Sequence, residues 1–351
     1  MRACVMRDHR LVVDEVADPR PEPGQVLVRT VACGICGSDL HFLRHADAMA
    51  AMTDEMLPSM GELGGLVTTQ IDLSRDIIMG HEFCGEVLEF GPDTVGPPPG
   101  ALVVSVPVLL AGGRVQQLAY NNEYPGGYAE SMLLSAPLVI EVPNGLDARR
   151  AALTEPLAVG LHATAKSGVT PADAAVVVGC GPVGLAVIAG LQLKGVEMIV
   201  AADYSPKRRA LALQMGATEA VDPKSEPVVE AWRRLDGHRP LVAFEAVGVP
   251  GMLQQLFRDL PPATRITVVG VCMEPDQVVP FFAIAKELSL QFALAYSTDE
   301  FAGALRAIAE GEVDVAPMVT ATVDLDGVPG AFDALGQPDQ EVKILVEPTS
   351  A

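Results

Sequence analysis

The sequence predicts an α/β protein in two parts: a doubly wound parallel sheet in the later half of the chain and a second, mainly β domain. Apolar runs at 176–178 and 198–202 flank a helical stretch at 185–194, which is the order strand, helix, strand. Residues 1–142 hold short apolar or alternating runs separated by proline and glycine, a pattern typical of β-structure. A chain of 351 residues is long enough for two cores.

The turn between the first strand and its helix carries Gly179-x-Gly181-x-x-Gly184. In such a turn the first glycine permits the tight bend, the second lets the backbone approach a pyrophosphate, and the third lets helix and strand pack closely. Pro182 and Val183 complete the turn, where free N–H groups and the positive end of the helix dipole attract phosphates. The segment therefore predicts a dinucleotide site.

Asp203 ends the second strand, where its carboxylate can hold both hydroxyls of an adenosine ribose. A carboxylate repels a 2′-phosphate, so Asp203 favours NAD over NADP, although the basic run Lys207, Arg208 and Arg209 keeps NADP open. Val247, Gly270 and Val271, near the ends of later strands, complete the expected cofactor site.

Two other interpretations of residues 174–191 are an ordinary strand–helix unit, whose glycines serve only packing, and a transmembrane helix, because the stretch is uncharged. The turn glycines and Pro182 argue against the membrane helix.

Composition narrows the class of protein. The formal net charge of −21 opposes binding to nucleic acid or to an anionic membrane. Residues 1–15 lack the continuous apolar core of a signal peptide. The six cysteines are scattered, which suits a reducing cytoplasm better than a disulfide framework. We therefore expect a cytoplasmic protein with a small-molecule partner.

The remaining elements follow from periodicity and turn residues. Strands are expected at 25–31, 101–110, 131–142, 241–246, 265–271 and 342–346. Helices are expected at 148–166, 206–215, 252–260 and 300–311. The predicted domains are 1–156 with 297–351, and 157–296.

Residues 42–79 are rich in methionine. Met49, Met52, Met56 and Met60 are spaced three or four apart and would share one face of a helix over 46–60. This face is expected to form a lid or wall of an apolar substrate site, to contact a second subunit, or to pack in the core.

A group of metal-ligating residue types precedes and follows that segment. Cys33 and Cys36 form a C-x-x-C pair, but the chain has no second such pair, which excludes a four-cysteine zinc site, and a redox pair would need a thioredoxin-like context that is absent. His81 stands beside Glu82 and downstream of Cys36 and His41, so a metal site is a credible alternative to a structural histidine.

Taken together, these motifs resemble those of the zinc-dependent medium-chain alcohol dehydrogenase superfamily, in the style of its polyol and threonine dehydrogenase branch. The motifs are CGICGSDLH (33–41), GHEFCGE (80–86), EPLAVGLHA (155–163), GCGPVG (179–184), DYSPKRR (203–209) and KILVEP (343–348). The resemblance implies a Rossmann-type domain with a GroES-like catalytic domain, a homodimer or homotetramer, and hydride transfer between NAD and a secondary alcohol or its ketone.

The resemblance also implies a single catalytic zinc ion. Cys36 and His81 would be ligands, and Glu155 and Glu82 are near equals as the third. Three protein ligands leave one position for the alcohol.

Three further residues take roles by the same resemblance. Asp39 would orient His81 through its second ring nitrogen, Ser38 would hydrogen-bond the substrate oxygen, and His41 would pass the proton outward through a ribose hydroxyl.

The sequence departs from the family in two places. Residues 92–125 contain no cysteine, so a structural zinc should be absent, and the stretch between His41 and His81 is long, which indicates an insertion near the substrate entrance.

Two alternative functions remain: a zinc-free NADPH reductase of quinones or enones, and a catalytically idle dinucleotide-binding protein. The presence of Cys36, His81 and Glu155 disfavours both.

Overall fold

The structure is a computed structural model that describes residues 1–60, 67–68, 71–337 and 339–349. The chain divides into two compact units, Met1–Glu155 with Val319–Ala351 (unit 1) and Pro156–Met318 (unit 2). No helix among the described residues combines the length and apolar character needed to cross a membrane.

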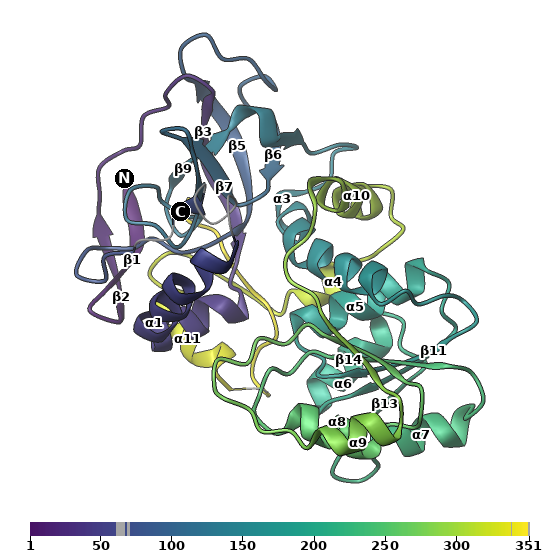
Figure 1. Cartoon of the computed structure of the whole chain (residues 1–351). Coiled ribbons are helices and arrows are strands. Elements are labelled where there is room, and N and C mark those ends of the chain that lie inside the picture. The colour runs from purple at the N-terminus through teal and green to yellow at the C-terminus, as the bar shows by residue number, and fades with distance from the viewer. Residues whose placement is uncertain (61–66, 69–70, 338, 350–351) are drawn as a thin grey trace. The chain divides into compact units, whose positions relative to one another are not determined.

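Unit 2 is built on a six-stranded parallel sheet of order β13-β12-β11-β14-β15-β16 (Figure 1). Its strands are β11 (Ala174–Val178), β12 (Met198–Ala202), β13 (Glu219–Val221), β14 (Leu241–Glu245), β15 (Arg265–Val268) and β16 (Ser289–Phe292). The chain starts in the middle of the sheet, winds to one edge and then returns to build the other. This is the predicted doubly wound arrangement, and the fold class is confirmed.

Helices connect these parallel strands, as parallel pairing requires. They are α5 (Pro182–Leu193), α6 (Pro206–Gln214), α7 (Val228–Leu235), α8 (Met252–Asp259) and α9 (Pro280–Ala285), with α10 (Thr298–Ala309) and η3 (Ala316–Met318) after the last strand. Strand β11 is buried along nearly its whole length, as its uninterrupted apolar run predicts.

Unit 1 is centred on a seven-stranded sheet of order β10-β6-β5-β3-β18-β17, with β9 also paired to β3. Its strands are β3 (Gln25–Gly34), β5 (Glu82–Phe90), β6 (Leu102–Ser105), β9 (Ser131–Ser135), β10 (Val139–Glu141), β17 (Ala321–Val323) and β18 (Ile344–Val346). Two smaller sheets pair β1 (Arg2–Arg7) with β2 (Arg10–Glu15), and β4 (Val67–Thr68) and β7 (Val108–Ala111) with β8 (Arg114–Gln117).

Two predicted strands and one predicted helix are broken in the structure. The run 101–110 becomes β6 and β7, which are separated by Val106 and Pro107, because proline has no N–H to continue a ladder. The run 131–142 is interrupted by η2 (Ala136–Leu138), which contains Pro137 in its first turn. The helix expected at 148–166 is α3 (Ala148–Ala151) followed by α4 (Thr154–Lys166).

The unit boundaries differ from the expected domain boundaries mainly at the second junction. The first junction lies at 155/156, against an expected 156/157, whereas the second lies at 318/319, against an expected 296/297. Helix α10 belongs to unit 2, where Glu300 accepts a hydrogen bond from Ser297 and lies 3.0 Å from Nδ1 of His162 on α4.

The methionine-rich helix begins earlier than predicted. Helix α1 runs Gly37–Met56, with non-helical dihedrals at His45, and η1 (Leu57–Met60) follows. Met49 packs against the core of unit 1, while Met52 and Met56 are about half exposed, so the four methionines do not form one buried face. The side chain of Met60 and residues 61–66 and 69–70 lie outside the described part of the chain.

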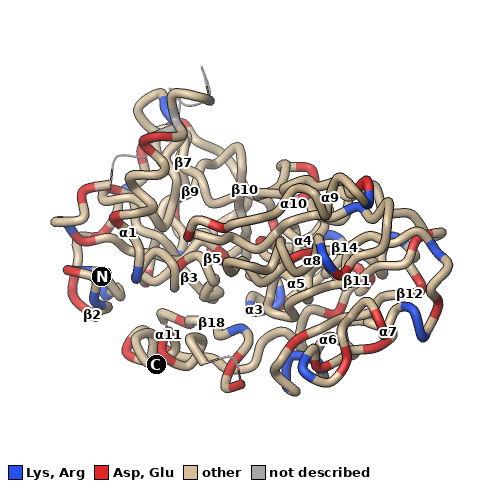
Figure 2. The backbone as a smooth tube through the Cα atoms, turned by 60° about the horizontal axis from the view of Figure 1, so that its bottom comes forward, with Lys and Arg blue, Asp and Glu red and all other residues tan. Residues whose placement is uncertain are grey.

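Acidic residues are spread over both units, as the net charge of −21 requires (Figure 2). Basic residues of unit 2 are partly neutralised by carboxylates, as where Arg234 pairs with Glu219 and Glu226.

Candidate active site

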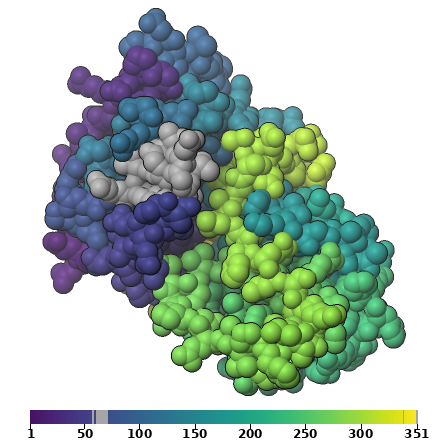
Figure 3. All heavy atoms as spheres, in the orientation of Figure 1, coloured from purple at the N-terminus to yellow at the C-terminus, as the bar shows by residue number. Residues whose placement is uncertain are grey.

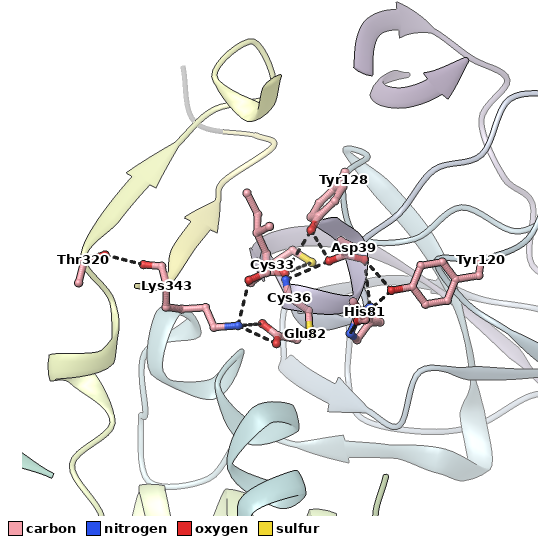
Figure 4. A network of polar contacts seen from close by, with 12 residues as sticks. Cys33, Cys36, Asp39, His81, Glu82, Tyr120, Tyr128, Thr320 and Lys343 are labelled. Atoms are coloured by element: carbon pink, nitrogen blue, oxygen red, sulfur yellow. Dashed lines mark hydrogen bonds and ion pairs between the residues drawn. The ribbon is translucent and has the colours of Figure 1, made fainter. Parts of the chain in front are cut away.

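Three chain segments meet at one end of the central sheet of unit 1. Gly34, the last residue of β3, stands opposite Glu82 of β5 on one side and Leu345 of β18 on the other. This register brings the Cys36 loop, the His81–Glu82 pair and Lys343 to the same place, although Lys343 is 261 residues from Glu82 in the sequence. The site is therefore assembled by strand pairing (Figure 4).

Asp39, in the first turn of α1, is the centre of a polar network and is completely buried. Its Oδ2 accepts hydrogen bonds from the Cys36 N–H (3.0 Å) and the Tyr128 hydroxyl (2.7 Å). Its Oδ1 lies 2.9 Å from the Tyr120 hydroxyl and 3.4 Å from Nδ1 of His81. Burial alone would raise the pKa of Asp39, but His81, Tyr128 and the Cys36 N–H outweigh it and lower the pKa below its ordinary value. Asp39 is thus a carboxylate that faces only donors.

Cys36, His81 and Glu82 each offer one ligand atom, and these three atoms lie within 4.8 Å of one another. A thiolate sulfur, an imidazole nitrogen and a carboxylate oxygen are the ligand types that zinc takes in proteins. Nδ1 of His81 faces Asp39, so Nε2 is left for a metal. By its chemistry this donor set fits a zinc ion.

Glu155 is not a member of that group among the residues that the structure describes. It lies near enough to Lys343 for its charge to raise the pKa of that lysine. The geometry thus separates the two glutamates that the sequence left near equal: Glu82 faces the ligand atoms, and Glu155 contributes to the field around Lys343.

Lys343 is fully buried beside the three candidate metal ligands. Its Nζ donates to both carboxylate oxygens of Glu82 (2.7 and 2.6 Å) and to the Ile35 carbonyl (3.0 Å). Burial lowers the pKa of Lys343, but Glu82 and the other nearby acidic groups raise it by more. The pKa is therefore above its ordinary value, and the lysine stays charged. Gly34 leaves the room for this pair, because a Cβ at Gly34 would lie 2.0 Å from Oε2 of Glu82.

Ser38 and His41 lie one turn apart at the start of α1, hence on the same side of the helix. Ser38 is partly exposed, and its Oγ lies 3.0 Å from the Tyr120 hydroxyl and 3.5 Å from Nε2 of His81. Burial lowers the pKa of His41, and the nearby His45 and Arg44 lower it further. Cys33, in contrast, is completely buried in β3 and burial raises its pKa well above the ordinary value, which does not fit a redox-active thiol.

In unit 2 the glycine-rich turn has the backbone that its sequence predicts. Gly179 has φ +94°, which favours glycine, and Gly181 precedes α5. A Cβ at Gly184 would lie 1.9 Å from the Gly179 carbonyl oxygen, whereas a Cβ at Gly181 would meet nothing within 4 Å. Gly184 is thus required for packing, and Gly181 faces open space.

The Asp203 carboxylate lies against this turn. Its Oδ2 accepts a hydrogen bond from the Cys180 N–H (2.9 Å) and its Oδ1 one from the Ser205 N–H (2.8 Å). Arg208 Nη1 is 4.0 Å from Oδ2, while Arg209 donates to the Asp203 and Tyr204 carbonyls. The carboxylate is therefore held at the end of β12, next to the start of α5.

The loops after β14 and β15 lie at the same edge of the sheet as the glycine-rich turn. Buried Glu245 joins them: its side chain accepts hydrogen bonds from the N–H groups of Val247 (2.7 Å) and Gly248 (2.9 Å), and its carbonyl accepts one from Gly270 N–H (2.9 Å). Val247 and Val271 are about half exposed. The carboxyl edge of a parallel sheet is where such folds bind ligands.

Sequence reasoning missed four residues that shape these sites: Tyr120, Tyr128, Glu245 and Lys343. A signal existed for Lys343, since a lysine inside the apolar run 342–346 predicts a buried partner. The tyrosines lie in or after a loop with no periodicity, so their hydroxyls had no sequence signature.

The family comparisons match both halves of the chain. Residues 22–144 match the model of the alcohol dehydrogenase GroES-like domain, and residues 182–310 match that of the zinc-binding dehydrogenase domain.

Relatives match over nearly the full length. The chain is 32% identical to (R,R)-butanediol dehydrogenase of Bacillus subtilis, with 96% of each chain covered, and 27% identical to sorbitol dehydrogenase of the same organism, with 99% and 97% covered. The crystal structure of 2R,3R-butanediol dehydrogenase from Bacillus subtilis superposes with a TM-score of 0.82 at 30% identity over 99% of both chains. These matches confirm the resemblance drawn from the sequence: the chain belongs to the zinc-dependent medium-chain alcohol dehydrogenase superfamily.

Proposed function

We propose that this oxidoreductase is an NAD-dependent dehydrogenase of a secondary alcohol and that one catalytic zinc ion is held by Cys36, His81 and Glu82. The observation that carries the proposal is the convergence of these three ligand atoms within 4.8 Å. With three protein ligands, a fourth position remains for the substrate oxygen.

The zinc ion, when bound, would make a substrate hydroxyl more acidic, and the nicotinamide would take the hydride. The protein's own groups position the reactants and move the proton. Asp39 Oδ1 lies 3.4 Å from Nδ1 of His81 and faces that nitrogen, which leaves Nε2 as the ligand atom. Ser38 accepts the hydrogen bond of the substrate hydroxyl, and His41, whose lowered pKa keeps it neutral, receives the proton further out.

The choice of a secondary alcohol is supported by the relatives, which are named as dehydrogenases of butanediol and sorbitol. The alternative of a zinc-free reductase is not favoured, because Cys36, His81 and Glu82 retain a complete donor set.

The preference for NAD is supported by Asp203. Both of its carboxylate oxygens accept backbone hydrogen bonds at the end of β12, and a carboxylate at this position of a dinucleotide-binding fold disfavours a 2′-phosphate. The proposal of a single zinc ion is supported by the lack of cysteine at 92–125. All six cysteines are free thiols, which supports a reducing compartment such as the cytoplasm.

We further propose a homodimer or homotetramer. Strand β16 is an edge strand of the sheet in unit 2, and apolar side chains on and near it are exposed: Phe281, Ile284, Leu290, Phe292 and Leu294. Figure 3 shows this part of unit 2, in yellow-green, at the molecular surface. An uncovered apolar edge strand invites pairing with a second copy.

The test combines metal content with a substrate screen. Protein grown with ample zinc should contain one zinc ion per chain, and Cys36→Ser should lose it while the buried Cys33→Ser variant retains it. The zinc-loaded wild type should oxidise secondary alcohols faster with NAD than with NADP. Two tightly bound ions per chain, no zinc, or turnover only of enones with NADPH would refute the proposal.

A further inference from the structure

We propose that Arg209 is a positioning residue for the cofactor: it holds the turn that carries Asp203, and it is not a ligand of a 2′-phosphate. This inference rests on the proposed function, in which Asp203 binds the adenosine ribose of NAD. The two neighbouring arginines then have separate tasks, because Arg208 lies beside the Asp203 carboxylate, whereas the Arg209 guanidinium faces the backbone of the turn.

The stability of helix α6 does not explain a basic residue at this position. The helix begins at Pro206, after the Ser205 cap, so Arg209 lies close to its N-terminus. The helix dipole makes that end positive, and a cation there is unfavourable for the helix. The benefit of Arg209 must therefore come from the groups that its side chain contacts.

The Arg209 side chain folds back onto the residues that precede the helix. Its Nη1 donates hydrogen bonds to the carbonyls of Asp203 and Tyr204, both at 2.8 Å. A guanidinium Nη carries two hydrogens, so these two bonds use both of them. The side chain is only 20% exposed, and Nη1 also lies 3.6 Å from Oδ2 of Asp222, directly after β13. This nitrogen is therefore occupied by the protein itself.

The turn is also tied to the neighbouring strand. Strands β12 and β13 are paired in parallel, and the Asp203 N–H donates to the Val221 carbonyl at 3.3 Å. Lys224, in the loop after β13, lies with its Nζ 5.2 Å from the centre of the Tyr204 ring. Arg209 thus joins the ends of two adjacent strands at the carboxyl edge of the sheet, where such folds bind dinucleotides.

The same turn determines where the Asp203 carboxylate points. Its Oδ1 accepts from the Ser205 N–H, which belongs to this turn, and its Oδ2 accepts from the Cys180 N–H, which belongs to the glycine-rich turn. A carboxylate binds both hydroxyls of a ribose only when its oxygens are directed at them. Loss of Arg209 would free the turn on the Ser205 side, so Asp203 would keep its charge but lose its fixed direction.

The two possible roles of Arg209 predict opposite effects on cofactor choice. If Arg209 orients Asp203, its removal should weaken the binding of NAD, which offers the ribose hydroxyls, and should leave the repulsion of a 2′-phosphate in place. If Arg209 were a ligand of the 2′-phosphate, its removal should weaken the binding of NADP and have little effect on NAD.

The experiment compares Arg209→Met with Arg234→Met in protein grown with ample zinc. Each variant removes one arginine charge from unit 2, but Arg234 pairs with Glu219 and Glu226. Calorimetry gives the Kd for NADH and for NADPH. Arg209→Met should weaken NADH binding by about three- to tenfold, the range expected for one hydrogen bond, and NADPH binding by less. Arg234→Met should change either Kd by less than about twofold, because solvent and salt screen its exposed charge. Unchanged NADH affinity in Arg209→Met, or a selective loss of NADPH affinity, would overturn the proposal.

A second comparison tests whether Arg209 acts through Asp203. In an Asp203→Ala background, adding Arg209→Met should change the Kd for NADH by less than about twofold, because the carboxylate that it orients is gone. An undiminished loss in that background would show that Arg209 acts elsewhere. If Arg209→Met does not fold, Arg209→Lys, which keeps the charge but lacks the planar fork, decides by the same comparison of NADH with NADPH.

Cofactor binding and alcohol turnover separate this proposal from the proposed function. Both Kd values are measured without an alcohol. A wild type that binds NADH but oxidises no alcohol would refute the proposed function, while the Kd values of Arg209→Met would still confirm or refute the role of Arg209. A wild type with no affinity for NADH would refute both.

Discussion

Lys343 Nζ donates to both carboxylate oxygens of Glu82, at 2.7 and 2.6 Å, and both side chains are buried. The same carboxylate faces Cys36 and His81 in the proposed metal site. Glu82 is thus shared between a fixed cation of the protein and a position for a metal ion. Lys343 compensates the charge of Glu82 before any metal binds.

Lys343→Met should destabilise the metal-free protein by about 3–5 kcal/mol, because it leaves a buried carboxylate without its cation. Urea unfolding followed by circular dichroism measures the loss. Saturating zinc should reduce the difference from the wild type, since the ion gives Glu82 another partner. The control is Glu82→Gln with Lys343→Met, which removes both charges and should recover much of the stability. If Lys343→Met without zinc were as stable as the zinc-free wild type, the inferred pairing of Lys343 with Glu82 would be contradicted.

Gly184→Ala and Gly181→Ala should separate packing from cofactor binding. A Cβ at Gly184 would lie 1.9 Å from the Gly179 carbonyl, so the variant should lose about 1–3 kcal/mol of stability without any ligand. Gly181 has φ −69° and open space around its Cβ position, so alanine there should alter stability by less than about 0.5 kcal/mol. Its cofactor affinity, measured by calorimetry, should nevertheless fall. Unchanged affinity in Gly181→Ala would argue against pyrophosphate binding at this turn.

Asp203→Ala should lower the ratio of kcat/KM with NAD to kcat/KM with NADP by about tenfold or more, equivalent to about 1.4 kcal/mol. The variant removes the fixed negative charge and leaves Arg208, 4.0 Å from the carboxylate, free to meet a 2′-phosphate. Steady-state kinetics with both cofactors measure the ratio. A wild type that already prefers NADP would show that the interpretation of Asp203 is wrong.

His41→Gln should slow alcohol oxidation more at low pH than at high pH. Burial and the nearby positive groups lower the pKa of His41, so in the wild type the ring is neutral near pH 7 and loses its accepting role only as the pH falls through that lowered pKa. In the variant, hydroxide replaces the base only at high pH. Zinc content should equal that of the wild type, and a loss of zinc would instead assign His41 to the metal.

Phe292→Lys should convert the oligomer to monomers, because it places a charge on the exposed edge strand β16. Light scattering coupled to size exclusion gives the mass. Val95→Lys, at an exposed position of unit 1, is the matched control and should leave the mass unchanged. A monomeric wild type, or an oligomer that persists in Phe292→Lys, would contradict the proposal that β16 forms the subunit interface.

The sequence predicted the parallel sheet and the glycine-rich turn because both depend on local patterns. The run Val176–Val178 and the spacing of Gly179, Gly181 and Gly184 contain nearly all the information needed. The single strands predicted at 101–110 and 131–142 are interrupted in the structure at Pro107 and Pro137. The prediction followed the apolar pattern and gave too little weight to the missing N–H of proline.

The residue types of the candidate metal ligands were predictable, but not which of the two glutamates lies beside Cys36 and His81. The distinction between Glu82 and Glu155 depends on the register of β3 with β5 and on the position of Lys343, which are contacts between distant segments. The position of Tyr120 depends on a loop in which Ala119 has a left-handed backbone conformation, and the residue propensities of the sequence do not indicate that conformation. Local sequence cannot supply either arrangement.

The pairing of β18 with β3 also constrains how the molecule is made. During synthesis, β3, β5 and the Cys36 loop leave the ribosome before all of unit 2, whereas Lys343 leaves it after unit 2. Until then Glu82 has no lysine, and the sheet of unit 1 lacks β17 and β18. A nascent chain therefore completes unit 2 before unit 1, so a truncation between Met318 and Lys343 would leave all of unit 2 and would remove Lys343 and β18 from unit 1.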